Sequence, residues 1–146
     1  MKVFASLAFL AVIALTGCKS SDSEPAQQYD TLNYKNALDL TGRFPDLSVS
    51  LRSLTDTRCP QNVICIQAGW VDLEFMVKSS TDSVRVSTVF YQDSGKDQPK
   101  RFKLGSESYQ LSIHRVLPLP TQGQRLRIDE YTVELSVVRD ANQLAI

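Results

Sequence analysis

Apolar and polar residues alternate along this chain in short runs, and this alternation restricts most of it to strands. From Val71 to Lys78 the sequence reads VDLEFMVK, in which every second residue is apolar and only Met76 interrupts the polar positions. Successive side chains of a strand point to opposite faces of a sheet, so this run predicts a strand with one buried face. No window keeps an apolar period of 3.6 residues with caps at both ends. We therefore expect an all-β fold.

Similar runs predict about seven short strands. They are Leu47–Leu51, Val84–Phe90, Tyr109–Leu117 and Tyr131–Val137, with Leu126 and Ile128 before the last in the opposite parity, and shorter candidates at Ala37–Thr41 and Arg101–Leu104. Leu54 falls out of phase with the first run, which predicts a β-bulge. Ser79–Asp82 predicts a hairpin turn, and Pro118 and Pro120 predict that the chain leaves the sheet after Leu117. Short strands separated by turns favour an antiparallel β-sandwich, or a small barrel.

The N-terminal segment has the features of an export signal. Lys2 precedes an uncharged apolar run, Val3–Ala14, that is too short to span a bilayer as a stable helix. This pattern is typical of a secretory signal peptide, and its end, Leu15-Thr16-Gly17-Cys18, resembles the bacterial lipobox. The resemblance implies that residues 1–17 are removed and that Cys18 is acylated, so that lipid chains tether the protein to a membrane.

Residues 18–28 are predicted to be a flexible linker, and residues 29–146 a single domain. The linker sequence KSSDSEPAQQ follows Cys18 and has no apolar residue larger than alanine. Lys19 stands where an aspartate would resemble an inner-membrane retention signal, so we expect the outer membrane of the cell envelope. Loss of Lys2 with the signal lowers the sixteen basic residues to fifteen, against sixteen acidic ones. This near-neutral balance argues against nucleic acid as a partner.

Two of the three cysteines, Cys59 and Cys65, lie in the segment DTRCPQNVICIQAG between two predicted strands. In an oxidising compartment this spacing favours a disulfide that closes a short loop. A zinc site, a redox pair and a cysteine nucleophile are the alternatives. The chain has no Cys-x-x-Cys, and His114 is its only histidine, which we expect on a solvated strand face. We accordingly expect no metal and no cofactor.

The same segment carries a resemblance to a known group of proteins. The pattern Asp56-x-Arg58-Cys59-Pro60-x-x-Val63-x-Cys65-x-x-Ala68-Gly69 is similar to a motif of uncharacterised bacterial lipoproteins and exported proteins. In that group a lipobox and a short linker precede one small β-domain that carries the motif. The group usually has an aromatic residue where this chain has Gln67, and Trp70 lies close by. The resemblance implies a layout and no activity.

Asp56 and Arg58 flank Thr57, so on an extended strand they share a face. They can pair with each other, or Arg58 can bond carbonyl groups of the loop that the disulfide closes. The structural interpretation is that the motif fixes this loop. The functional interpretation is a recognition loop, whose members are Asp56, Arg58, Gln61, Asn62, Gln67 and Trp70.

These features predict a lipid-anchored envelope protein that acts as a non-catalytic binding or assembly module. Its expected partners are the membrane, through the anchor, and another envelope protein or a glycan. One alternative is a small hydrolytic or accessory enzyme that uses carboxylates, with Asp56, Asp72 and Glu74 as candidates. Another is a protease inhibitor that presents the loop around Arg58.

Overall fold

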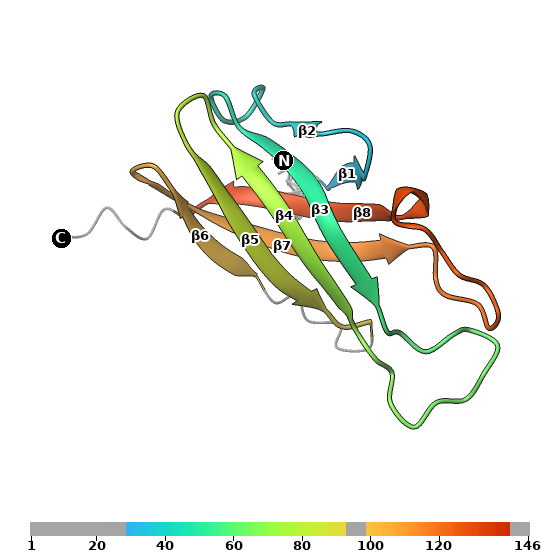
Figure 1. The fold of residues 1–146 in the computed structure, drawn as a ribbon. Helices are drawn as coiled ribbons and strands as arrows, with labels where there is room; N and C mark the ends of the chain where they lie inside the picture. The colour runs from blue at the N-terminus through green and yellow to red at the C-terminus, as the bar shows by residue number, and fades with distance from the viewer. Residues whose placement is uncertain (1–28, 93–98, 141–146) are drawn as a thin grey trace, which may run out of the picture.

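In the computed structural model, which describes residues 29–92 and 99–140, the alternating runs form eight strands. They are β1 (Asp30–Asn33), β2 (Leu38–Asp39), β3 (Ser48–Asp56), β4 (Val71–Lys78), β5 (Ser83–Phe90), β6 (Lys100–Leu104), β7 (Glu107–Leu117) and β8 (Thr132–Arg139). One sheet has the order β2-β3-β4-β5 and the other β1-β8-β7-β6, and all pairs are antiparallel (Figure 1). The predicted β-sandwich is confirmed, and neither sheet closes into a barrel.

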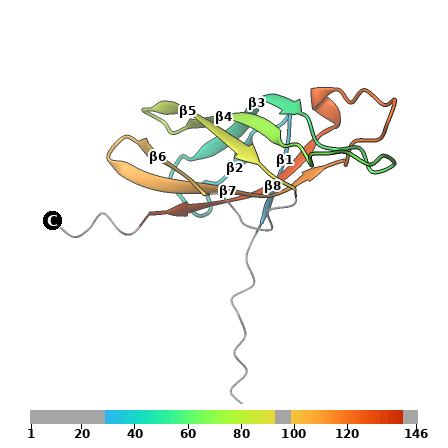
Figure 2. The same ribbon diagram turned by 90° about the horizontal axis from the view of Figure 1, so that it is seen from below.

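One sheet is a meander of four consecutive strands that begins with the short β2, and the other is a meander of three with the short β1 added at its edge. Strands β3, β4 and β5 follow one another in one layer, and β6, β7 and β8 do so in the other (Figure 2). The chain changes layer between β1 and β2, and again between β5 and β6. Both meanders therefore bring hairpin loops to the ends of the sandwich.

The core lies between the two layers and consists mostly of residues predicted from the alternation, with Leu32 and Val116 among the residues that were not predicted. Along β4 the inward side chains of Val71, Leu73, Phe75 and Val77 are buried, as are those of β8 and most of β7. Burial of a side chain of this size contributes about 1.5 to 3 kcal/mol. The stability of the sandwich comes mainly from these side chains, which are buried between the two sheets.

Two bulges adjust the register. The predicted bulge after Leu51 is confirmed by a register shift between Leu51 and Ser53. A second shift, around His114, was not predicted, and beyond it Val116 is buried where the alternation predicted Leu117. His114 is half-buried, and its Nε2 lies 2.8 Å from the Ser136 hydroxyl, so its expected solvated position was wrong.

Other differences lie outside the long strands. Leu126 and Ile128, expected before the last strand in the opposite parity, lie in a loop and in a short 3₁₀-helix, Ile128–Glu130, that precede β8. Strand β1 was not predicted. The expected signal peptide, Cys18 and the linker lie outside the described residues. In the part of the chain that the structure describes, no helix is long and apolar enough to cross a membrane.

Candidate functional site: the disulfide-closed loop between β3 and β4

The β3–β4 hairpin continues beyond the ends of its strands and carries the loop of residues 57–70, which projects from one end of the sandwich (Figure 1). The Thr57 amide donates to the Trp70 carbonyl at 2.9 Å, and the Cys59 amide donates to the Ala68 carbonyl at 2.7 Å. Gly69 lies between these bonds with φ +74°, and a Cβ there would come within 2.0 Å of the Thr57 carbonyl oxygen. Only glycine permits this close approach.

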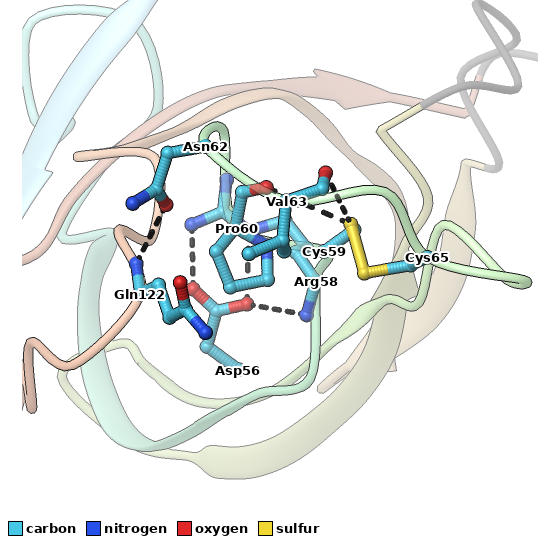
Figure 3. The surroundings of a disulfide bond; sticks show 8 residues. All are labelled: Asp56, Arg58, Cys59, Pro60, Asn62, Val63, Cys65 and Gln122. Carbon is cyan, nitrogen blue, oxygen red and sulfur yellow. Dashed lines mark hydrogen bonds and ion pairs between the residues drawn. A yellow bond between two sulfur atoms is a disulfide. The ribbon is translucent and has the colours of Figure 1, made fainter.

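The predicted disulfide between Cys59 and Cys65 is confirmed, with 5.9 Å between the two Cα atoms (Figure 3). Inside the closed segment the Val63 amide donates to the Pro60 carbonyl at 3.3 Å, which forms a turn. The disulfide therefore fixes the outer half of the loop. The backbone hydrogen bonds of Thr57 and Cys59, which extend the β3–β4 ladder, fix its base.

Arg58 fastens the base of the loop to the opposite sheet. Its guanidinium forms a paired contact with Asp56, with Nε 2.9 Å from Oδ1 and Nη2 2.6 Å from Oδ2 (Figure 3). The same group donates to the Val116 carbonyl at 2.7 Å and to the Pro118 carbonyl at 2.9 Å. Arg58 is only 4% exposed. Because Val116 is in β7, this side chain joins the end of β3 to the facing layer.

The two carboxylate oxygens of Asp56 accept further hydrogen bonds besides those from the Arg58 guanidinium. The backbone amide of Arg58 donates to Asp56 Oδ1 at 2.9 Å, and the Tyr131 hydroxyl donates to Oδ2 at 3.2 Å. Burial raises the pKa of Asp56, but the hydrogen bonds and charge of Arg58 outweigh it and leave the pKa below its ordinary value. Burial, together with the charge of Asp56 and its hydrogen bond, raises the pKa of Tyr131 to about 12.

A second set of contacts joins the loop to the segment between β7 and β8. The backbone amide of Gln61 donates to the Pro120 carbonyl at 3.0 Å, and the backbone amide of Gln122 donates to the side-chain oxygen of Asn62 at 2.9 Å. As predicted, the chain has left the sheet after Leu117, and this departure places the proline segment beside the loop. The loop of residues 57–70 is thus held along one side as well as at its base.

The tip of this fixed loop exposes two large apolar side chains. Ile64 is 103% exposed and Ile66 is 105% exposed, on either side of Cys65. Beside Ile66, an open hollow of about 300 Å³ is lined by both cysteines, Gln67, Ala68 and Gln92. Sequence reasoning missed the two isoleucines. The available signal was a pair of β-branched apolar residues inside a segment that the prolines and glycine marked as a loop.

The six residues of the predicted recognition loop separate into two groups. Gln61, Asn62, Gln67 and Trp70 are exposed, whereas Asp56 and Arg58 lie behind the loop and present nothing to a partner. The expectation that Asp56 and Arg58 belong to a recognition surface was wrong, because both are consumed in anchoring. Their expected pairing is confirmed, but the carbonyls that Arg58 binds belong to Val116 and Pro118, not to the loop.

The same burial bears on the two alternative functions. A protease inhibitor must insert its basic side chain into the protease, and Arg58 is enclosed with its guanidinium bonded on all sides. A carboxylate that acts as acid or base needs a lone pair for the proton, and each oxygen of Asp56 already accepts two hydrogen bonds. Asp72 and Glu74 share the outer face of β4, as predicted. Among the described residues, no three side chains of His, Cys, Asp or Glu form a metal-binding group.

Fold and site together define a class, namely an open β-sandwich in which a disulfide and a buried ion pair fix one projecting hairpin loop. Comparison with protein-family models, with curated proteins and with solved structures finds no match to this chain.

Proposed function

We propose that this protein is a lipid-anchored envelope protein, tethered through Cys18 to the outer membrane, that acts as a non-catalytic binding or assembly module. The loop of residues 57–70 is its contact surface for a protein partner. The observation that carries this proposal is the exposure of Ile64 and Ile66 on a loop held by a disulfide and a buried ion pair.

Preorganisation is the physical reason to read this arrangement as a binding surface. A loop that is already fixed loses little conformational entropy when a partner binds it. Each isoleucine that moves from water into an apolar pocket contributes about 1.5 to 3 kcal/mol. The exposed amides of Gln61, Asn62 and Gln67 around the tip supply a polar rim of the kind that surrounds apolar contacts in protein interfaces.

Site-specific photo-crosslinking in living cells tests this surface. A photoreactive side chain replaces Ile66 in the full chain, and a matched variant carries it at Val138, which is 49% exposed on the other sheet. We expect one discrete protein adduct from position 66 and none of that size from position 138.

The fixed shape of the loop is tested in the same cells. Cys59→Ser/Cys65→Ser removes the disulfide while leaving the photoreactive group in place, and we expect the adduct to weaken strongly. The same adducts from both positions, or an adduct from position 66 that is indifferent to the disulfide, would contradict the proposed role of the loop.

A further inference from the structure

The outer face of the sheet that carries the loop has a second surface, built from three neighbouring strands. Ser53, Glu74 and Ser87 lie side by side across β3, β4 and β5, and Thr55, Asp72 and Val89 form the next row. Together with Leu73 and Thr88, these residues line an open hollow of about 280 Å³. Apart from Val89, the outward-facing side chains of these two rows carry hydroxyl or carboxylate groups.

Two aromatic residues, Trp70 and Tyr91, lie one position beyond the row of Asp72 and Val89 that lines this hollow. Trp70 immediately precedes β4 and Tyr91 immediately follows β5, so the register that pairs Val71 with Phe90 brings them together. Their ring centroids are 6.5 Å apart, and the rings are 40% and 47% exposed, respectively. The indole N–H of Trp70 donates to Asp72 Oδ2 at 3.0 Å. That bond sets the indole ring at the rim of the hollow.

The chemistry of the lining selects among ligands. Among the residues that the structure describes, the lining contains two carboxylates and four hydroxyl residues, Ser53, Thr55, Ser87 and Thr88, and no basic residue. Carboxylates accept hydrogen bonds from hydroxyl or ammonium donors and repel phosphate, sulfate and acidic groups. Exposed aromatic faces beside such acceptors suit a ligand with C–H groups on one face and hydroxyls around its edge. A sugar ring has this distribution of groups.

From this juxtaposition we propose a binding site for a glycan of neutral or amino sugars on the outer face of β3, β4 and β5. The rings of Trp70 and Tyr91 stack on one sugar unit, and Asp72 and Glu74 accept hydrogen bonds from the next one along the hollow. The site is separate from the loop tip and does not depend on the protein partner proposed above.

The single tryptophan of the chain makes the test direct, because Trp70 is part of the proposed site. Tryptophan emission of the full chain is titrated with cellohexaose, maltohexaose, chitohexaose and the hexamer of glucosamine, and with dextran sulfate as an anionic comparison. We expect a saturable change with at least one of the four oligosaccharides and none with dextran sulfate. No saturable change with any of the four, or stronger binding of dextran sulfate, would overturn the proposal.

Variants locate the binding on this face. Tyr91→Ala and the isosteric Glu74→Gln are expected to weaken affinity by about tenfold, the usual cost of truncating a central contact. Tyr34→Ala, at an exposed tyrosine near β1, and Ile64→Ser/Ile66→Ser are expected to bind as the wild type does. Full affinity in both Tyr91→Ala and Glu74→Gln would refute the site, and loss of affinity only in the isoleucine variant would place sugar binding at the loop tip instead.

Discussion

Arg58 pairs with Asp56 in a place where ion pairs add little net stability. Removing two charges from water costs about as much as their attraction returns, so a buried pair is retained chiefly for the geometry it imposes. Here that geometry is a bond between two sheets, because Arg58 reaches the Val116 and Pro118 carbonyls while it holds Asp56. The pair sets the direction in which the loop leaves β3.

Arg58→Ala is expected to lower the free energy of unfolding by about 3 to 5 kcal/mol, because it leaves the Asp56 carboxylate buried without its positively charged partner. Arg127→Ala is the matched control, since Arg127 and Asp129 form an ion pair of the same residue types at the same separation and Arg127 is exposed. The control should cost about 1 kcal/mol or less. Urea denaturation of both variants measures the difference, and equal losses would contradict the anchoring role.

Substitution of Gly69 tests the close approach of its backbone to the Thr57 carbonyl at the base of the loop. Gly69→Ala introduces a positive φ for a residue with Cβ, which costs about 1 to 3 kcal/mol, and adds a clash with the Thr57 carbonyl. Gly123→Ala is the control, because Gly123 has φ +81° and no atom within 4 Å of the added Cβ. Thermal unfolding should show a clearly larger loss for Gly69→Ala. Equal losses would mean that φ alone, and not the Thr57 contact, determines the need for glycine.

Tyr131 predicts a loss of stability at alkaline pH. The folded protein raises the pKa of Tyr131 to about 12 from an ordinary value of 10.0, so it favours the neutral phenol more than the unfolded chain does. This contribution is complete below about pH 10 and disappears as the pH rises through 12. Tyr131→Phe should flatten this part of the stability curve. A wild-type slope in Tyr131→Phe would mean that the buried Tyr131 hydroxyl is not the source of the alkaline loss of stability.

At the scale of elements, the disulfide and the extension of the β3–β4 ladder hold different parts of the loop. The ladder orders the base through the Thr57 and Cys59 amides, and the disulfide closes the outer part across only a few residues. Cys59→Ser/Cys65→Ser is expected to lower the free energy of unfolding by about 2 kcal/mol, the modest gain typical of so short a closed loop. Comparison of oxidised wild type with the double variant measures it. A loss as large as that of Arg58→Ala would contradict this division.

The elements also explain which features were predictable from sequence. Strand β4 and the first bulge follow from local alternation, since a side chain that leaves the two-residue period has only a bulge to accommodate it. The bulge at His114 was not predicted because Leu117 continues the parity of Leu111 and Ile113, so the sequence shows no break in the alternation. Strand β1 has a single buried apolar residue, Leu32, which leaves no alternation to detect.

The site was harder to predict than the strands because it depends on long-range packing. The Asp56–Arg58 pair follows from their spacing on an extended chain, but the Val116 carbonyl is 58 residues from Arg58 in sequence. The contact of Trp70 with Tyr91 depends on the β4–β5 register, which no local pattern specifies. Exposure of Ile64 likewise depends on how the closed loop turns.

At the scale of the whole molecule, the proposed anchor and the proposed surfaces make separate predictions. Cys18→Ser should release the protein from the membrane fraction into the soluble envelope fraction, because acyl chains supply the stable attachment. The photo-crosslinking variants retain Cys18, so anchoring and loop binding are measured independently. Membrane retention of Cys18→Ser at the wild-type level would contradict the lipid anchor and leave the fold and the loop contacts as described.

The central claim is that the loop of residues 57–70 is preformed, and amide hydrogen exchange of the full chain tests it most directly. The amides of Arg58, Cys59 and Gln61 all donate hydrogen bonds, to Asp56, Ala68 and Pro120 respectively. We predict that these amides exchange much more slowly than those of an unstructured chain, because the hydrogen bonds that hold the base and side of the loop must open first. Exchange at the rate of an unstructured chain would mean that the loop has no fixed shape before it meets a partner.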